Sequence, residues 1–450
     1  MERVFPTGSV VEAMLKFCVR MAVLACFLAT AGEAFAEGFA LYEYSARGVA
    51  LSGSVMARKA DASAVAYNPA LITQMKGMHA MAGVSAIYPR GKMTWHDDDT
   101  ETTRLKHSLW FIPHAYYTHQ INDDWYFGVG EFTRYGLGFE YPHNWPGRFN
   151  IYEVALTSFS INPNIAWKAT DKLSLAVGVE VVYVNLDLKK RSKVDMVPGV
   201  ASFEVDANIQ DADAWGVGGN FAAHYQFSDQ WAIGAQYRSQ VRVHAYGDME
   251  YTYKGYTGPS QLPLGPGGAA VPGNAVAQGA YNQNFKDGGA DAIVVLPDSL
   301  AAGVSWTPVP ELSIEVGAIW TRWSTFKSLN INLPEPINQS KTAKNWRDTW
   351  RFNLGVEWEV LDWLTLRVGY AYDQSPMTEE YADYLVPTAN RNIYSGGLGF
   401  RWEAWTLDLA YSIIVPKERN YNTSSETNTV RSKPSDSYTQ IFAVSLAYEF

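Results

Sequence analysis

The chain has 450 residues, of which 14% are aromatic and only 18% are charged, a charged fraction that is low for a soluble protein. The mean hydropathy is nonetheless −0.17. No apolar run of about 18 residues occurs outside the N-terminus, which argues against a bundle of membrane helices. The net charge of −10 argues against a nucleic-acid partner.

The N-terminus has the pattern of a secretory signal peptide, which we assign to residues 1–36. Residues 14–20 form a short basic region, residues 21–31 form an apolar stretch, and residues 34–36 form an A-x-A cleavage site. The acidic residues and the proline ahead of Met14 suggest that translation starts at Met14. The sequence therefore predicts export, with a mature chain that starts after residue 36.

No motif for catalysis or metal binding is evident. Cys18 and Cys26 both lie in the signal segment, so the mature chain is predicted to lack a disulfide, a cysteine metal site and a cysteine nucleophile. The eight histidines are scattered and show no zinc-binding spacing. A serine elbow and a phosphate loop are also absent from the sequence. We therefore expect no catalytic residues, no metal and no cofactor, and a protein that is not an enzyme.

Residues 37–76 are rich in small and polar side chains and do not alternate as a strand does. Such a segment can pack closely in a confined space but cannot build a core of its own. Asp61 and Ser63 are suited to cap short helices, and Asn68-Pro69 is a turn signal. We interpret residues 37–76 as a hatch that plugs a barrel formed by residues 77–450.

From residue 77 onward apolar and polar residues alternate with a period of two, which predicts fourteen strands. Their connections alternate between short turns and long segments, as in transmembrane barrels with periplasmic turns and extracellular loops. The fold class predicted is all-β, a fourteen-stranded antiparallel transmembrane barrel. The strand ranges are 77–90, 107–119, 124–138, 151–168, 172–188, 212–227, 230–247, 291–307, 311–327, 345–360, 363–374, 391–403, 404–415 and 437–450.

The final strand places Phe442, Val444, Leu446, Tyr448 and Phe450 on one face. A terminal phenylalanine preceded by alternating apolar residues resembles the signal read by the barrel assembly machinery. That machinery is therefore an expected partner, and the bacterial outer membrane the expected location. An ordinary amphipathic strand at a chain end is the alternative.

Short motifs recur along the predicted hatch and barrel: Gly38-Phe39, Asn68-Pro-Ala-Leu-Ile-Thr73, Tyr135-Gly-Leu137, Leu296-Pro-Asp298, Trp320-Thr-Arg-Trp-Ser324, Trp346-Arg-Asp-Thr-Trp-Arg351 and Gly369-Tyr-Ala-Tyr-Asp-Gln-Ser-Pro376. In sequence and in order along the chain, these segments resemble the FadL-type long-chain fatty acid transporters of Gram-negative outer membranes. The resemblance implies a barrel plugged by an N-terminal hatch, capture of hydrophobic cargo at outer loops, and sideways exit at a kinked strand.

A fatty acid needs apolar walls and one or two cations for its carboxylate. The resemblance places the N-terminal tail in the pocket, which makes Phe39 a candidate wall. It also places Lys190 or Arg191 where the family has a carboxylate-binding arginine, although this basic run could instead be a solvated loop or contact lipopolysaccharide. Lys344 could supply a second cation.

Two further groups are candidates for shape and exit. Asn68, Pro69 and Ala70 form the hatch motif, as a structural turn or as ligand-lining residues. In the third strand Glu131 and Arg134 fall on opposite faces under strict alternation, so one would face lipid unless the strand breaks near Gly136. We therefore expect a lateral gate at Arg134 and Gly136, with Arg134 near a tolerant rim as the alternative.

The function predicted is passive outer-membrane transport of long-chain fatty acids or similar hydrophobic compounds. The alternatives are the same mechanism for aromatic hydrocarbons, a general porin, and an adhesin or phage-receptor barrel. We expect a monomer whose partners are the hydrophobic cargo, outer-membrane lipid and lipopolysaccharide. The segment 37–76 argues against a porin, which should have an open lumen.

Overall fold

A computed structural model describes residues 38–95, 101–263, 270–424 and 427–450. The predicted signal peptide and its alternative start at Met14 lie outside these residues. Among the residues described, no helix is both long enough and apolar enough to cross a membrane.

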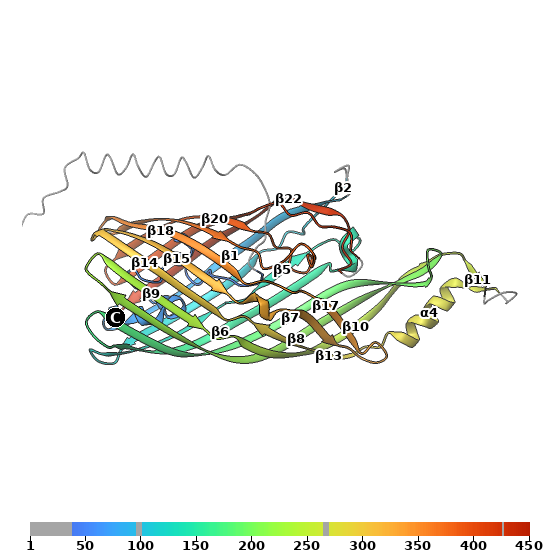
Figure 1. Ribbon diagram of the computed structural model, residues 1–450, viewed down its shortest axis with the longest axis horizontal. Helices are drawn as coiled ribbons and strands as arrows, with labels where there is room; N and C mark the ends of the chain where they lie inside the picture. The colour runs from blue at the N-terminus through green and yellow to red at the C-terminus, as the bar shows by residue number, and fades with distance from the viewer. Residues whose placement is uncertain (1–37, 96–100, 264–269, 425–426) are drawn as a thin grey trace, which may run out of the picture. The chain divides into compact units, whose positions relative to one another are not determined.

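Strands make up most of the chain (Figure 1). The helices are short, apart from one in an outer segment: α2 (Ala46–Ala50), α3 (Ala64–Tyr67) and α4 (Gly273–Asn284), with 3-10 turns η1 (Pro69–Gln74), η2 (Pro146–Phe149) and η3 (Trp323–Thr325). The strands are β1 (Met78–Trp95), β2 (Glu101–Arg104), β3 (Trp110–Gln120), β4 (Trp125–Phe132), β5 (Leu137–Glu140), β6 (Glu153–Lys168), β7 (Leu173–Val197), β8 (Ala201–Gln226), β9 (Trp231–Arg238), β10 (Val241–Thr257), β11 (Gln261–Pro263), β12 (Ala270–Pro272), β13 (Gly288–Leu296), β14 (Ser299–Val309), β15 (Leu312–Thr321), β16 (Ser328–Asn332), β17 (Gln339–Ala343), β18 (Thr349–Leu361), β19 (Leu364–Asp373), β20 (Arg391–Trp402), β21 (Trp405–Pro416) and β22 (Ser432–Glu449).

The sheet closes on itself because β22 pairs antiparallel with β1, from His79↔Glu449 to Trp95↔Ser432. The remaining ladders join neighbours in chain order. Several predicted strands are interrupted, so that β4 and β5, β9 and β10, β13 and β14, and β15 and β16 each form one strand of the barrel wall. With these pairs joined, the wall has fourteen antiparallel strands, which confirms the predicted fold class.

Side chains alternate between the lumen and the outside, as a barrel in lipid requires. In β22, Phe442 and Leu446 are exposed, whereas Ile441, Ala443 and Ser445 are buried. Exposed tryptophans gather near the short turns, where Trp125 stacks on Trp167. Trp231 and Trp306 form a similar pair across β9 and β14. Aromatic residues at such positions mark a membrane interface.

The outer segments contain more regular structure than the sequence indicates. β7 and β8 form one long hairpin through the segment 189–211, which lies between two predicted strands. Cross-strand ion pairs such as Arg191 with Asp206 stabilise this extension, because charged pairs are compatible with a strand that has left the membrane. The segment 248–290 contains the end of β10 and helix α4 as well as turns.

Residues 38–76, the described part of the hatch, precede β1 and are largely buried inside the barrel. α2 packs against β19 to β22, and η1 packs against β4, β6, β7 and β8. Tyr67 holds two parts of the hatch together, because its hydroxyl donates to the Tyr42 carbonyl at 2.8 Å and accepts from the Tyr44 N–H. Gly48 must lack a side chain, since a Cβ there would lie 2.0 Å from this hydroxyl.

Candidate functional site

Three cavities in the barrel differ in position and lining. The outer cavity lies between β7, β8, β10, β16 and β17 and has a volume of about 220 Å³. The side cavity, of about 300 Å³, lies beside the interruption between β4 and β5. The base cavity, of about 420 Å³, lies between the hatch and the short turns. The first two are lined mainly by apolar side chains, whereas about half of the residues that line the third are charged.

The outer cavity combines apolar walls with a small number of polar groups. Lys190 and Ser192 reach it from β7, and Lys344 and Asp383 reach it from the segments after β17 and β19. Such a lining suits a ligand with an apolar body and one charged end. Its apolar lining consists of Leu188, Ala207, Ile209, Met249, Tyr251, Phe285, Leu329, Ile331, Leu333, Ile337 and Leu385.

Lys190 and Arg191 are neighbours in β7 but face in different directions. Arg191 is committed to ion pairs, at 2.7 Å to Asp206 and 3.2 Å to Glu204. Lys190 lines the outer cavity, and its ammonium has no hydrogen-bond or ion-pair partner within the described part of the chain. An unpaired cation in an apolar cavity is costly unless an anionic ligand completes it.

Lys344, the second predicted cation, is fully buried and lines the same cavity. Its ammonium is paired with the carboxylate of Asp383, which is also buried. Lys344 is therefore already neutralised, and Lys190 carries the uncompensated charge of this cavity.

Phe39 lies in a cluster of aromatic rings below the outer segments. Its ring centroid is 4.8 Å from that of Trp323, and Tyr135, Phe326 and Trp346 are within 6.0 Å. Gly38, with a φ of +59°, approaches the same tryptophans so closely that a Cβ would lie 2.8 Å from each. Phe39 lines neither the outer nor the side cavity, although its neighbours Gly38 and Ala40 line the latter.

Hydrogen bonds of the hatch motif hold the hatch in shape. The Asn68 side chain accepts a hydrogen bond from the Ala70 N–H, which caps η1, and donates to the carbonyls of Met56 and Ala223. Pro69 follows as the first residue of the turn, a position where its missing N–H costs nothing. Asn68, Pro69 and Ala70 line none of the three cavities.

The barrel wall has a gap in hydrogen bonding beside the third strand. β3 pairs with β4 only from Ala115 to Gln120, and β5 pairs with β6 alone. Residues 110–114 of β3 therefore pair with β1 but, among the described residues, with no strand on their other side. The side cavity lies in this gap. Its lining runs from the hatch residues Gly38, Ala40 and Leu41 to the strongly exposed Phe111 on the outside of the wall.

Arg134 and Gly136, the predicted gate residues, lie in the interruption between β4 and β5 and bind the N-terminal segment. The Leu41 N–H donates to the Arg134 carbonyl at 2.8 Å, and the Gly136 N–H donates to the Phe39 carbonyl at 2.9 Å. The Arg134 guanidinium points into the barrel and forms a buried ion pair with Glu180. A Cβ at Gly136 would lie 2.7 Å from Leu41, so the glycine permits this close approach.

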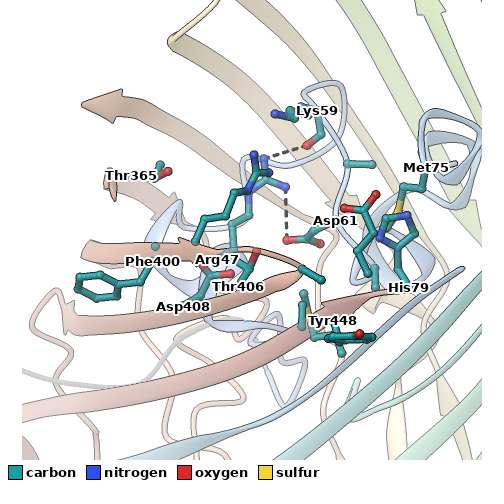
Figure 2. A pocket seen from close by; sticks show the side chains of 18 of the residues that line it. Arg47, Lys59, Asp61, Met75, His79, Thr365, Phe400, Thr406, Asp408 and Tyr448 are labelled. Atoms are coloured by element: carbon teal, nitrogen blue, oxygen red, sulfur yellow. Dashed lines mark hydrogen bonds and ion pairs between the residues drawn. The ribbon is translucent and has the colours of Figure 1, made fainter. Parts of the chain in front are cut away.

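The base cavity has a different chemistry (Figure 2). Arg47 of α2 donates to the Lys59 carbonyl at 2.8 Å and lies 3.4 Å from Asp61, as the dashed lines show. It also makes two hydrogen bonds to Glu357 of β18 at 2.7 Å. Arg367 joins the same carboxylate to Asp408. This end of the barrel interior is therefore a seam of ion pairs between the hatch and the wall.

A second carboxylate, Glu315 of β15, holds the hatch from the other side. It is fully buried and accepts hydrogen bonds from three consecutive backbone N–H groups, those of residues 56–58. The guanidinium of Arg58 lies 3.5 Å away. Sequence analysis missed the roles of Glu315 and Glu357. Their signal was an acidic residue at a lumen-facing position of an alternating strand.

Comparison with known proteins bears on the whole chain. The family model described as "Outer membrane protein transport protein (OMPP1/FadL/TodX)" matches residues 27–450. Outer membrane protein P1 of Haemophilus influenzae is 25% identical, with 97% of this chain and 100% of the relative covered. The long-chain fatty acid transport protein of Escherichia coli is 24% identical, with 96% of this chain and 98% of the relative covered.

Solved structures show the same fold. A FadL homologue from Pseudomonas aeruginosa superposes with a TM-score of 0.78 at 20% identity, covering 92% of this chain and all of the other. The toluene transporter TodX of Pseudomonas putida superposes with a TM-score of 0.70 at 19% identity, covering 91% of this chain and 99% of the other. The match to the family model spans nearly the whole chain, so the protein belongs to this family of outer-membrane transport proteins, whose members are transporters rather than enzymes.

Proposed function

We propose that the protein carries long-chain fatty acids from the outer cavity, past the hatch, to the side cavity, where they leave laterally into the membrane. This narrows the coarser assignment, transport of hydrophobic compounds across the outer membrane, to one class of cargo. The long-chain fatty acid transport protein of Escherichia coli is one relative, and the TodX toluene transporter is a structural neighbour. Relatives therefore leave the choice between fatty acids and aromatic hydrocarbons open.

The observation that carries the choice is the unpaired ammonium of Lys190 in the apolar outer cavity. A fatty acid matches both parts of this lining, with its tail against side chains such as Ile209 and Leu329 and its carboxylate at the cation. An aromatic hydrocarbon would leave the cation unsatisfied. The cavity therefore favours an anionic amphiphile over a neutral hydrocarbon.

The lateral route is supported by the wall itself. Its hydrogen-bond ladder is missing beside residues 110–114, and the side cavity that fills the gap is lined by apolar groups such as Leu41, Leu137 and Ile441. The straight route toward the short turns passes the ion pairs of Arg47, Glu357 and Arg367, which suit an apolar tail poorly.

The test compares three solutes in cells that lack their own fatty acid uptake. We expect this protein to increase oleate uptake strongly, toluene uptake weakly, and conductance to a small sugar not at all. Toluene uptake without oleate uptake would move the assignment to aromatic hydrocarbons. Sugar conductance without oleate uptake would contradict transport of hydrophobic cargo altogether.

A further inference from the structure

The side cavity carries two carboxylates that an apolar exit does not need, Glu43 of the hatch and Glu131 of β4. We propose that these groups make the side cavity selective for the uncharged form of its cargo. A carboxylic acid would then leave the barrel only after its carboxylate has taken up a proton. This inference rests on the proposed fatty acid function and adds the chemical form in which the cargo departs.

Glu131 is placed by strict strand alternation. It pairs with Ala115 of β3 and with Ile161 of β6, whose side chain is 42% exposed on the outer face of the barrel. Its carboxylate lines the side cavity and, within the described chain, has no hydrogen-bond or ion-pair partner. Charged residues on the lipid face of a barrel are destabilising, so an unpaired one at a wall opening points to a function.

The charge balance of the side cavity is negative. Its titratable lining residues are Glu43, Glu131, Tyr135 and Arg391. The Arg391 guanidinium donates one hydrogen bond of 2.7 Å from Nε to Asp373 and forms an ion pair with the same carboxylate oxygen, so its charge is offset there. The Tyr135 hydroxyl donates to the Pro297 carbonyl. Among the described residues that line the side cavity, no cation is thus left to compensate Glu43 and Glu131, and a carboxylate cargo entering this cavity is repelled.

The outer cavity has the opposite charge, because it presents Lys190. An ionised fatty acid is therefore attracted to the outer cavity and repelled from the side cavity. A carboxylate oxygen of the cargo takes one proton from a hydronium ion, so that an O–H bond forms on the cargo while one O–H bond of the hydronium breaks and leaves water. The cargo thereby loses its negative charge. The neutral acid can then enter hydrocarbon without burying a charge, whereas a cargo that is never charged needs no such step.

The experiment measures uptake of radiolabelled oleate and oleyl alcohol by uptake-deficient cells at pH 6 and pH 8.5. Wild-type oleate uptake should fall with pH, by up to about tenfold per pH unit above the pKa of the bound acid, while alcohol uptake stays constant. Glu131→Gln should raise oleate uptake at pH 8.5 by about fivefold or more, because the repulsion is weakened. It should change alcohol uptake by less than about twofold.

Two further variants complete the design. Glu43→Gln should act in the same direction as Glu131→Gln, and Glu311→Gln, an exposed carboxylate in the turn after β14, should change nothing. Migration of unheated and heated samples on gels checks that each barrel is folded. An oleate-to-alcohol ratio that Glu131→Gln leaves unchanged at both pH values overturns the charge selectivity alone. Absence of wild-type uptake of both cargoes overturns the proposed function, and the selectivity with it.

Discussion

The side cavity and the base cavity both touch the hatch, yet they are built from opposite chemistries. The side cavity is bounded by residues such as Leu41, Ile112 and Leu137 and lies where the wall lacks hydrogen bonds. The base cavity is bounded by the ion pairs of Arg47 and Arg367 and lies where β18 is paired with β19 (Figure 2). The difference shows how one plug can direct cargo, because an apolar molecule meets charge below and apolar surface at the side.

The largest expected effect comes from breaking the hatch's attachment. Glu315→Gln removes the negative charge of a carboxylate that accepts hydrogen bonds from three backbone N–H groups and lies beside Arg58. Breaking a buried ion pair in this way costs about 3–5 kcal/mol. We expect the hatch to undock and the barrel to conduct ions and small sugars, measured in planar bilayers.

Glu311→Gln is the matched control for that change, since Glu311 is exposed and lies in a turn of the same strand pair. The Glu311→Gln variant should produce no added conductance in planar bilayers. If the Glu315→Gln variant also failed to conduct ions and small sugars, the contacts of Glu315 with the hatch would not be what keeps the straight route closed.

The next largest effect concerns the binding of the fatty acid in the outer cavity. Lys190→Gln should weaken oleate binding by about 1.5–3 kcal/mol, which is at least tenfold in affinity, because a charge-assisted hydrogen bond is lost. Lys193→Gln serves as the control, since Lys193 is exposed in the same strand and pairs with Asp195 at the surface. Titration calorimetry of the detergent-solubilised protein measures both. Equal affinities for the two variants would reject Lys190 as the carboxylate-binding residue.

A comparable or smaller effect should follow from filling the exit. A leucine at Gly136 would overlap Leu41 in the side cavity. Overpacking of this kind costs about 1–3 kcal/mol, and we expect oleate uptake to fall about tenfold while binding in the outer cavity is retained. Gly289→Leu is the control, because Gly289 in β13 has no atom within 4 Å of the added Cβ. Normal uptake by Gly136→Leu would place the exit elsewhere.

The smallest effect should come from the base cavity. Lys59 and Glu359 form an ion pair of 3.4 Å there, and both side chains are largely exposed. Glu359→Gln should change stability by less than about 0.5 kcal/mol and oleate uptake not at all, because exposed pairs contribute little. Thermal unfolding and uptake are measured together. A clear loss of uptake would bring the base cavity into the transport route.

The sequence predicted the wall well because alternation is a local property. Strands such as β6 and β22 follow directly from their period of two. Glu131 and Arg134 lie on opposite faces, as predicted, although β4 ends at Phe132, between them. The break between β4 and β5 could be anticipated from the glycines around Gly136 and from the cost of a charge facing lipid.

The cavities could not be predicted in the same way, because each joins residues distant along the chain. Arg191 and Lys190 look equivalent in sequence, and only the positions of Asp206 and Glu204 on β8 show which cation is occupied. Lys344 likewise gains its partner Asp383 from a different loop. Such pairings depend on the register of the ladders, which a single sequence leaves open.

The most direct test of the lateral route is a photoreactive fatty acid with a diazirine near its methyl end, cross-linked during uptake and mapped by mass spectrometry. The account predicts labelled peptides from the segments 110–113 and 133–138, both of which contribute to the lining of the side cavity. Labelling concentrated instead at residues 357–367 and 399–408, around the base cavity, would contradict it.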